Sequence, residues 1–150
     1  MRHRYATCGI VLSRSPLGET NALVTLCTPE LGIVRARAQG ARAQGAKLAV
    51  ALATFAESSF ILVRGKEGWR IAGAVLEENW FKRLPTHSAR TRAARVCGLL
   101  LRLSAGEAQD RKLFPVMRGF LEALALLPED HQEDAEILAA LRVLSALGLD

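Results

Sequence analysis

The chain has 150 residues, half of them hydrophobic, and a formal net charge of +5 at pH 7. This composition excludes a disordered protein, and the length fits one ordinary domain or two small ones that share a core. Residues 81–118 carry nine basic and two acidic side chains, whereas residues 119–150 carry one basic and seven acidic side chains. The uneven charge favours an anionic partner that contacts the first two thirds of the chain.

Five segments in the first 80 residues show the alternation of β-strands, and they are separated by Gly- and Pro-containing turns: 7–14, 22–28, 33–39, 54–64 and 69–77. Short antiparallel strands at this spacing predict a small closed barrel, most often an OB-fold. In the third strand, period two places Val34, Ala36 and Ala38 inside and Arg35, Arg37 and Gln39 outside. In the fifth strand, the same period places Trp69, Ile71 and Val75 on one face.

Beyond about residue 80, Leu, Ala and Arg replace the β-branched residues, and the predicted elements are three helices: 88–104, 110–127 and 133–147. Ser88 and Asp110 are the expected N-caps of the first two helices. Ile137, Leu141 and Leu144 form the expected buried stripe of the third. The predicted fold class is therefore α+β, with a five-stranded antiparallel OB-fold barrel over 1–80 and a small helical domain over 81–150.

The stretch Leu31–Lys47 is basic and rich in Gly and Ala, and no acidic residue occurs between Glu30 and Glu57. It contains a tandem pentapeptide over 37–46 that we interpret as a mobile loop. Such a stretch suits the phosphates of DNA, whose contacts are independent of base sequence. The predicted contacts lie on this stretch and on neighbouring strand ends: Arg35, Arg37, Arg42, Lys47, Arg14 and Arg70. The alternative is a solvated basic face with a disordered loop tip.

Single strands bind OB-folds largely by stacking their bases on aromatic side chains. In the predicted barrel the candidates are Phe55, Phe60 and Trp69, which we expect mostly in the core. The sequence therefore predicts a surface that contacts phosphates and has little means of reading bases.

A second basic group, Arg90, Arg92 and Arg95, occupies the first half of the first helix. Cations there oppose the helix dipole, so they have either a partner, such as an acidic peptide or DNA, or only solvent around them.

No nucleophile–base pair, phosphate-binding loop or carboxylate pair is recognisable, so we expect no enzymatic activity and no cofactor. Cys8, Cys27 and Cys97 lack metal-ligand spacing, which predicts buried free thiols and no metal site. No apolar run or signal peptide indicates a membrane, and a cytoplasmic protein is expected.

The order of short motifs resembles the RecO family of bacterial DNA repair and recombination mediators. The matching segments are Gly9-Ile10-Val11-Leu12, Gly18-Glu19, Val24-Thr25-Leu26, Glu30-Leu31-Gly32, Val34-Arg35-Ala36 and Gly40-Ala41-Arg42. Many members have Asp where this chain has Asn21, and Arg where it has Gln39. Many also carry a cysteine zinc site and further helices after the third helix, so the resemblance implies that the helical domain is incomplete.

The resemblance implies an OB-fold that binds single- and double-stranded DNA, anneals complementary strands and acts with RecR. It also implies loading of the RecA recombinase and contact with the acidic tail of single-strand binding protein, near the nucleoid. Three hypotheses follow from the sequence: a non-enzymatic DNA-binding mediator, a protein-interaction adaptor that docks a partner subunit or the acidic tail, and a non-functional remnant.

Overall fold

The structure is a computed structural model that describes residues 3–40, 46–104 and 109–149, with side chains excluded for residues 46 and 47. The strands come first along the chain: β1 (His3–Leu17), β2 (Asn21–Thr28), β3 (Gly32–Ala38), β4 (Ala56–Gly65) and β5 (Gly68–Asn79). The described residues also form five helices: α1 (Ala46–Ala51), α2 (Trp80–Arg83), α3 (His87–Ser104), α4 (Leu113–Leu126) and α5 (Glu129–Ala146).

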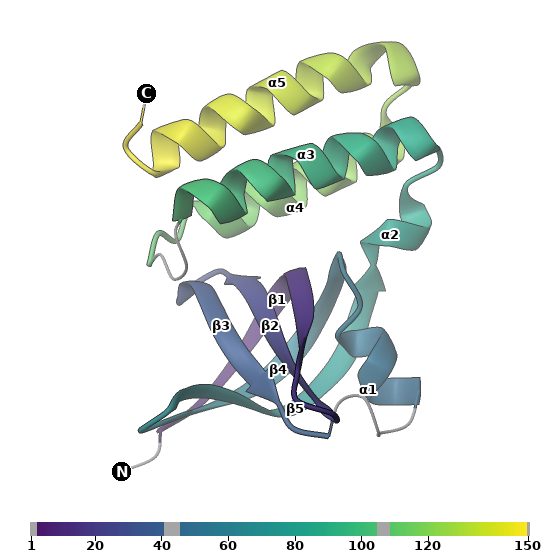
Figure 1. Ribbon diagram of the computed structural model, residues 1–150. Helices are drawn as coiled ribbons and strands as arrows, with labels where there is room; N and C mark the ends of the chain where they lie inside the picture. The colour runs from purple at the N-terminus through teal and green to yellow at the C-terminus, as the bar shows by residue number, and fades with distance from the viewer. Residues whose placement is uncertain (1–2, 41–45, 105–108, 150) are drawn as a thin grey trace.

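The five strands form a closed barrel in the order β1-β2-β3-β5-β4, which confirms the predicted OB-type barrel (Figure 1). Four of the five pairings are antiparallel. The fifth is parallel, because β3 joins β5 with Ala36 opposite Trp69 and Arg37 opposite Arg70. The sheet is therefore mixed, and the expectation of antiparallel pairing throughout was wrong at this one junction.

The alternation of β3 is confirmed, whereas that of β5 breaks in the middle of the strand. Val34, Ala36 and Ala38 are buried inside the barrel beside Val24, Leu26 and Leu62. In β5, a register shift opposite Ile61 and Leu62 adds one residue, and Val75 becomes 65% exposed. A β-bulge reverses which residues point inward, so the prediction that Val75 shares a face with Trp69 and Ile71 was wrong.

Two elements near the barrel differ from the predictions: β1 is longer than predicted, and α1 was not predicted. β1 begins at His3, so Tyr5 belongs to the barrel wall opposite Leu62. The short helix α1 follows the basic stretch, and Leu48 and Leu52 pack against the barrel core. The pentapeptide loop predicted over 37–46 lies partly outside the described residues.

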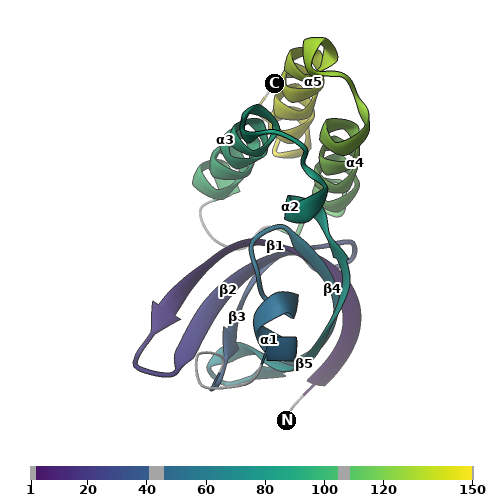
Figure 2. The same ribbon diagram turned by 90° about the vertical axis from the view of Figure 1, so that its right-hand side faces the viewer.

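The helices α3, α4 and α5 lie over the end of the barrel opposite α1 (Figures 1 and 2). A second hydrophobic cluster joins Ile10, Cys27 and Ile33 of the barrel to residues of α3, α4 and α5. Barrel and helices therefore share a core. A buried polar link reinforces it, because Glu57 of β4 accepts hydrogen bonds from Trp80 of α2 and Arg118 of α4.

The helix boundaries and one helix face differ from expectation. The hydroxyl of Thr86, not Ser88, accepts the bond from Ala89 N at the start of α3. α5 starts directly after Pro128 and buries Ala139 and Val143. Ile137 and Leu141 are 52% and 57% exposed, so the predicted buried stripe was wrong for these two residues.

In the part of the chain that the structure describes, no helix is both long and apolar enough to cross a membrane.

Candidate nucleic-acid interface

The outer face of β3 carries Arg35 and Arg37, as the alternation predicts. Arg35 is exposed and stands opposite Thr25 of β2. Arg37 is half-buried because it is covered on one side by the hairpin that joins β4 to β5. The two guanidinium groups therefore differ: Arg35 projects into solvent, whereas Arg37 is held in place.

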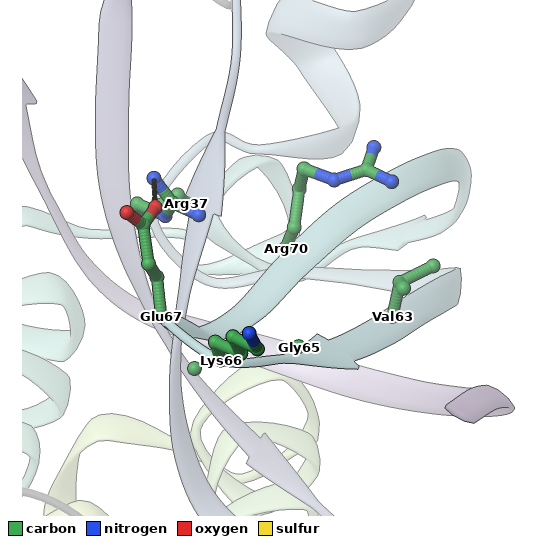
Figure 3. Close-up of a pocket in the computed structure, with 7 residues that line it drawn as sticks. Arg37, Val63, Gly65, Lys66, Glu67 and Arg70 are labelled. Atoms are coloured by element: carbon green, nitrogen blue, oxygen red, sulfur yellow. Dashed lines mark ion pairs between the residues drawn. The ribbon is translucent and has the colours of Figure 1, made fainter. Parts of the chain in front are cut away.

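A pocket of about 430 Å³ lies at the β4–β5 hairpin, and we call it the basic pocket (Figure 3). It is lined by Arg37 of β3, Arg70 of β5, the hairpin-tip residues Lys66 and Glu67, and Val63, Gly65 and Gly68. Arg37 and Arg70 are neighbours because they are opposite each other in the parallel β3–β5 pairing. Two strands and a turn thus contribute three cations and one carboxylate to the lining of one pocket.

Glu67 is the one acidic residue of the basic pocket, and it engages Arg37. Its Oε2 lies 3.0 Å from Arg37 Nη1, with Glu67 77% and Arg37 32% exposed at the side chain. Arg37 Nε is buried and has no hydrogen-bond partner within the described ranges. The guanidinium therefore has donor capacity that its present partner leaves unused. Arg70 extends from β5 clear of this ion pair (Figure 3).

The hairpin keeps its shape through Gly68, whose φ of 97° lies in the left-handed region. Side-chain-bearing residues rarely adopt this conformation, whereas Gly does so at little cost. Gly65 at the other end of the turn does not have a positive φ. The position of Lys66 and Glu67 over Arg37 thus depends on one glycine.

The remaining predicted DNA contacts are not gathered at the basic pocket. Arg14 is exposed on the part of β1 that pairs with β2, so β2 and β3 separate it from Arg70 along the sheet. Arg42 lies outside the described residues. Lys47 belongs to α1, and its side chain is not among those described. The structure therefore unites Arg37 and Arg70, with Arg35 two residues away along β3.

The second basic group, on α3, is engaged within the chain. Arg92 Nη1 and Arg95 Nε each lie 2.7 Å from the carboxylate of Glu136 on α5. The hydrogen bond from Arg95, followed by that from Arg92, holds the pKa of Glu136 below its usual value. Arg90 instead places its guanidinium 4.5 Å from the ring centroid of Phe81. Arg92 and Arg95 therefore have a partner that the sequence did not reveal.

The cysteines are thiols held in apolar surroundings. Burial raises the pKa of Cys27, and of Cys97, to about 12. The Cys97 thiol donates to the carbonyl oxygen of Leu12 at 3.2 Å. Among the residues the structure describes, no group of His, Cys, Asp and Glu could hold a metal ion.

Two features of this surface were missed from the sequence. Glu67 was not expected to neutralise Arg37, because hairpin geometry decides which strand the tip covers. The predicted first strand, 7–14, excludes Tyr5, although Tyr5 continues the strand pattern upstream and lies edge-on to Trp69, with ring centroids 5.2 Å apart.

Comparisons with known proteins place this barrel in a family. The model described as "Recombination protein O N terminal" matches residues 1–78. The DNA repair protein RecO of Gloeobacter violaceus is 34% identical over 146 residues, which are 96% of this chain and 55% of that protein. The protein of the same name from Roseiflexus sp. is 36% identical over 126 residues, 83% of this chain and 44% of that protein.

The chain thus spans about half the length of the curated relatives it matches. The matched region includes the five strands except the last residue of β5, together with the basic pocket and the motifs that suggested the resemblance. Because the family model covers more than half of its residues, the chain belongs to the RecO family.

Proposed function

We propose that this chain binds DNA through the basic pocket and the adjoining outer face of β3, as a non-enzymatic mediator of DNA repair and recombination. The observation that carries the proposal is the convergence of Arg37, Arg70 and Lys66 at one hairpin. Cations from separate elements suit successive backbone phosphates, and such contacts give affinity without sequence preference. The relatives are named DNA repair proteins, which supports the same role here.

In this proposal, residues 1–80 form the DNA-binding domain and residues 81–150 a helical domain. DNA contacts come from Arg35, Arg37 and Arg70, with Arg14, Arg42 and Lys47 extending the surface. The chain binds single- and double-stranded DNA, anneals complementary strands and helps to load recombinase on single-stranded DNA at the nucleoid, together with RecR.

The test is a titration of a labelled single-stranded oligonucleotide at two salt concentrations, followed by fluorescence anisotropy. The variant is Arg37→Ala/Arg70→Ala, and the matched control is Arg102→Ala/Arg142→Ala, which removes two exposed cations from α3 and α5. Each lost phosphate contact should lower the slope of log affinity against log salt by about 0.7 for a single strand.

We expect weaker binding and a shallower salt slope for the basic-pocket variant only. Equal loss in both double variants would show that net charge alone attracts the DNA. An affinity of the wild-type chain that ignores salt would rule out binding through phosphates.

A second function, docking of an acidic peptide such as the tail of single-strand binding protein, concerns Arg90, Arg92 and Arg95. The favouring observation is Arg90, which stacks on the exposed ring of Phe81 and has no carboxylate partner among the described residues. Arg92 and Arg95 would have to exchange Glu136 for the peptide. Arg90→Ala should weaken binding of an acidic peptide and leave DNA affinity unchanged. Loss of DNA affinity instead would place Arg90 in the DNA-binding surface.

A further inference from the structure

A second cleft, of about 680 Å³, lies beside the same hairpin, and we call it the Tyr5 cleft. Its floor is aromatic, formed by Tyr5 of β1 and Trp69 of β5. The turn between β2 and β3 contributes Glu30 and Leu31 to one wall, and Arg64 and Arg111 border the cleft from β4 and from the segment before α4. The cleft therefore combines aromatic and apolar surface with two cations and one carboxylate.

The aromatic groups in this cleft are arranged for stacking. Tyr5 is 42% exposed, whereas Trp69 is 9% exposed. The two rings pack edge to face, with an interplanar angle of 73°. The guanidinium of Arg64 lies 5.2 Å from the centroid of the Trp69 ring. Trp69 is thus held by its own burial and by the Arg64 cation, and Tyr5 keeps surface free for a planar ligand.

The walls are held by local hydrogen bonds before any ligand arrives. The hydroxyl of Thr28 accepts from Leu31 N at 3.0 Å and donates to the carbonyl oxygen of Gly32 at 2.9 Å. On the opposite wall, Asp110 Oδ1 accepts from Lys112 N at 2.7 Å and so fixes the backbone next to Arg111. A cleft with fixed walls loses little conformational entropy on binding.

The Tyr5 cleft and the basic pocket lie on opposite faces of one hairpin. Arg64 is opposite Trp69, and the neighbouring residues Val63 and Arg70 are opposite each other. Successive residues of a strand point to opposite faces. The first pair therefore borders the Tyr5 cleft, and the second lines the basic pocket. An extended polymer would have to cross the hairpin to contact both surfaces.

We propose that the Tyr5 cleft holds an unpaired nucleobase of a single DNA strand, stacked on Tyr5, while Arg64 and Arg111 contact the flanking phosphates. This inference rests on the proposed DNA binding and adds base stacking to it. It keeps the expectation that the barrel has little means of reading base sequence, and adds a contact with the base itself. Every base has an aromatic face, so the subsite selects single-stranded over double-stranded DNA without selecting sequence.

The test compares oligothymidine with an abasic oligonucleotide of the same length and phosphate count, by fluorescence anisotropy at one salt concentration. Stacking contributes about 1 to 3 kcal/mol per base, so the wild-type chain should prefer oligothymidine by about 5- to 160-fold. Tyr5→Leu should remove most of this preference while abasic affinity changes by less than about twofold. Tyr5→Phe, which keeps the ring, should retain the preference.

The control is Phe81→Leu, which removes an aromatic ring of the same 42% exposure from the helical part of the chain. It should leave the preference unchanged. Abasic binding by each variant also reports whether its phosphate-binding surface is intact, and a thermal melt by circular dichroism checks its fold.

The outcomes separate the two proposals. A wild-type chain that binds both oligonucleotides equally overturns the stacking site and leaves the proposed DNA binding intact. Binding to neither oligonucleotide overturns the proposed function. Retention of the preference in Tyr5→Leu, its loss in Tyr5→Phe, or an equal loss of both affinities in Tyr5→Leu overturns stacking on Tyr5. If Tyr5→Leu abolishes binding of an acidic peptide and leaves both DNA affinities unchanged, the cleft is a peptide site and the inference is wrong.

Discussion

The carboxylate of Glu67 lies 3.0 Å from Nη1 of Arg37, so the hairpin tip holds an anion against the cation proposed to bind a phosphate. Glu67→Gln removes this competitor and one negative charge, and both changes favour DNA. We expect about a 2- to 5-fold gain in affinity for single-stranded DNA at low salt, because exposed ion pairs contribute up to about 1 kcal/mol. Anisotropy titration measures the gain, which should shrink as salt rises.

The matched control for this change is Glu133→Gln, which removes an exposed carboxylate from α5. A gain confined to Glu67→Gln shows that the ion pair with Arg37 restrains binding. An equal gain in both variants would show that overall charge is responsible, and a loss in Glu67→Gln would mean that the ion pair positions Arg37 for the DNA.

Gly68 and Gly65 end the same hairpin, and an added Cβ would meet open space at either position. They differ in backbone conformation, because Gly68 has a φ of 97°. Gly68→Ala should therefore cost about 1 to 2 kcal/mol of unfolding free energy and weaken DNA binding by displacing Lys66, whereas Gly65→Ala should do neither. Urea unfolding and the anisotropy titration test this pair, and equal costs would contradict the role of the turn conformation.

Glu136 joins α5 to α3, and its pKa lies below the usual value because Arg95 and Arg92 donate to it. A lowered pKa stabilises the fold above the ordinary Glu pKa of about 4.3, and this contribution is lost as pH falls through the lower folded value. Glu136→Gln should destabilise the chain by about 1 to 2 kcal/mol at pH 7. Urea unfolding at pH 7 and pH 3 should show a larger difference from wild type at pH 7 than at pH 3.

The comparison for this position is Glu133→Gln, an exposed change on the same helix, which should stay within about 0.5 kcal/mol of wild type at both pH values. A penalty for Glu136→Gln that is the same at pH 3 would mean that side-chain packing, and not the charge, links the two helices.

Glu57 is 9% exposed and accepts hydrogen bonds from the indole of Trp80 at 2.9 Å and from Arg118 at 3.2 Å. Glu57→Ala leaves the buried indole N–H without an acceptor, so it should cost about 3 kcal/mol of unfolding free energy. Glu57→Gln keeps an amide oxygen for Trp80 and should cost about 1 kcal/mol. Urea unfolding followed by circular dichroism distinguishes them, and equal costs would show that the hydrogen bond to Trp80 contributes little.

The barrel was predictable because its strands carry a regular local pattern. Val34, Ala36 and Ala38 alternate with larger polar residues in a strand that has no bulge, so period two gave their orientation correctly. The same rule failed at Val75, because the bulge depends on pairing with β4, and Gly73 beside it is the only local sign in the sequence of β5. The alternation of apolar and polar residues therefore predicts that a strand exists more reliably than it predicts which residues point inward beyond a bulge.

The errors in the helices have a different cause. α5 has apolar residues around much of its circumference, and the prediction placed the larger ones, Ile137 and Leu141, in the buried stripe. Ala139 is buried instead, on the same side as Val143, because the helix uses a face with a small residue to approach its neighbours. The Arg92–Glu136 and Arg95–Glu136 contacts join residues 44 and 41 positions apart, a distance at which no local pattern gives information.

The short parallel pairing between β3 and β5 affects how firmly the barrel is closed. It is in register at two Cα pairs, Ala36–Trp69 and Arg37–Arg70, whereas β1 and β4 are in register at eight. These two pairs also stand between the basic pocket and the Tyr5 cleft. A ligand that contacts both surfaces would bridge the strand pair with the fewest paired residues in the barrel. Binding of DNA there would therefore also stabilise the closed barrel.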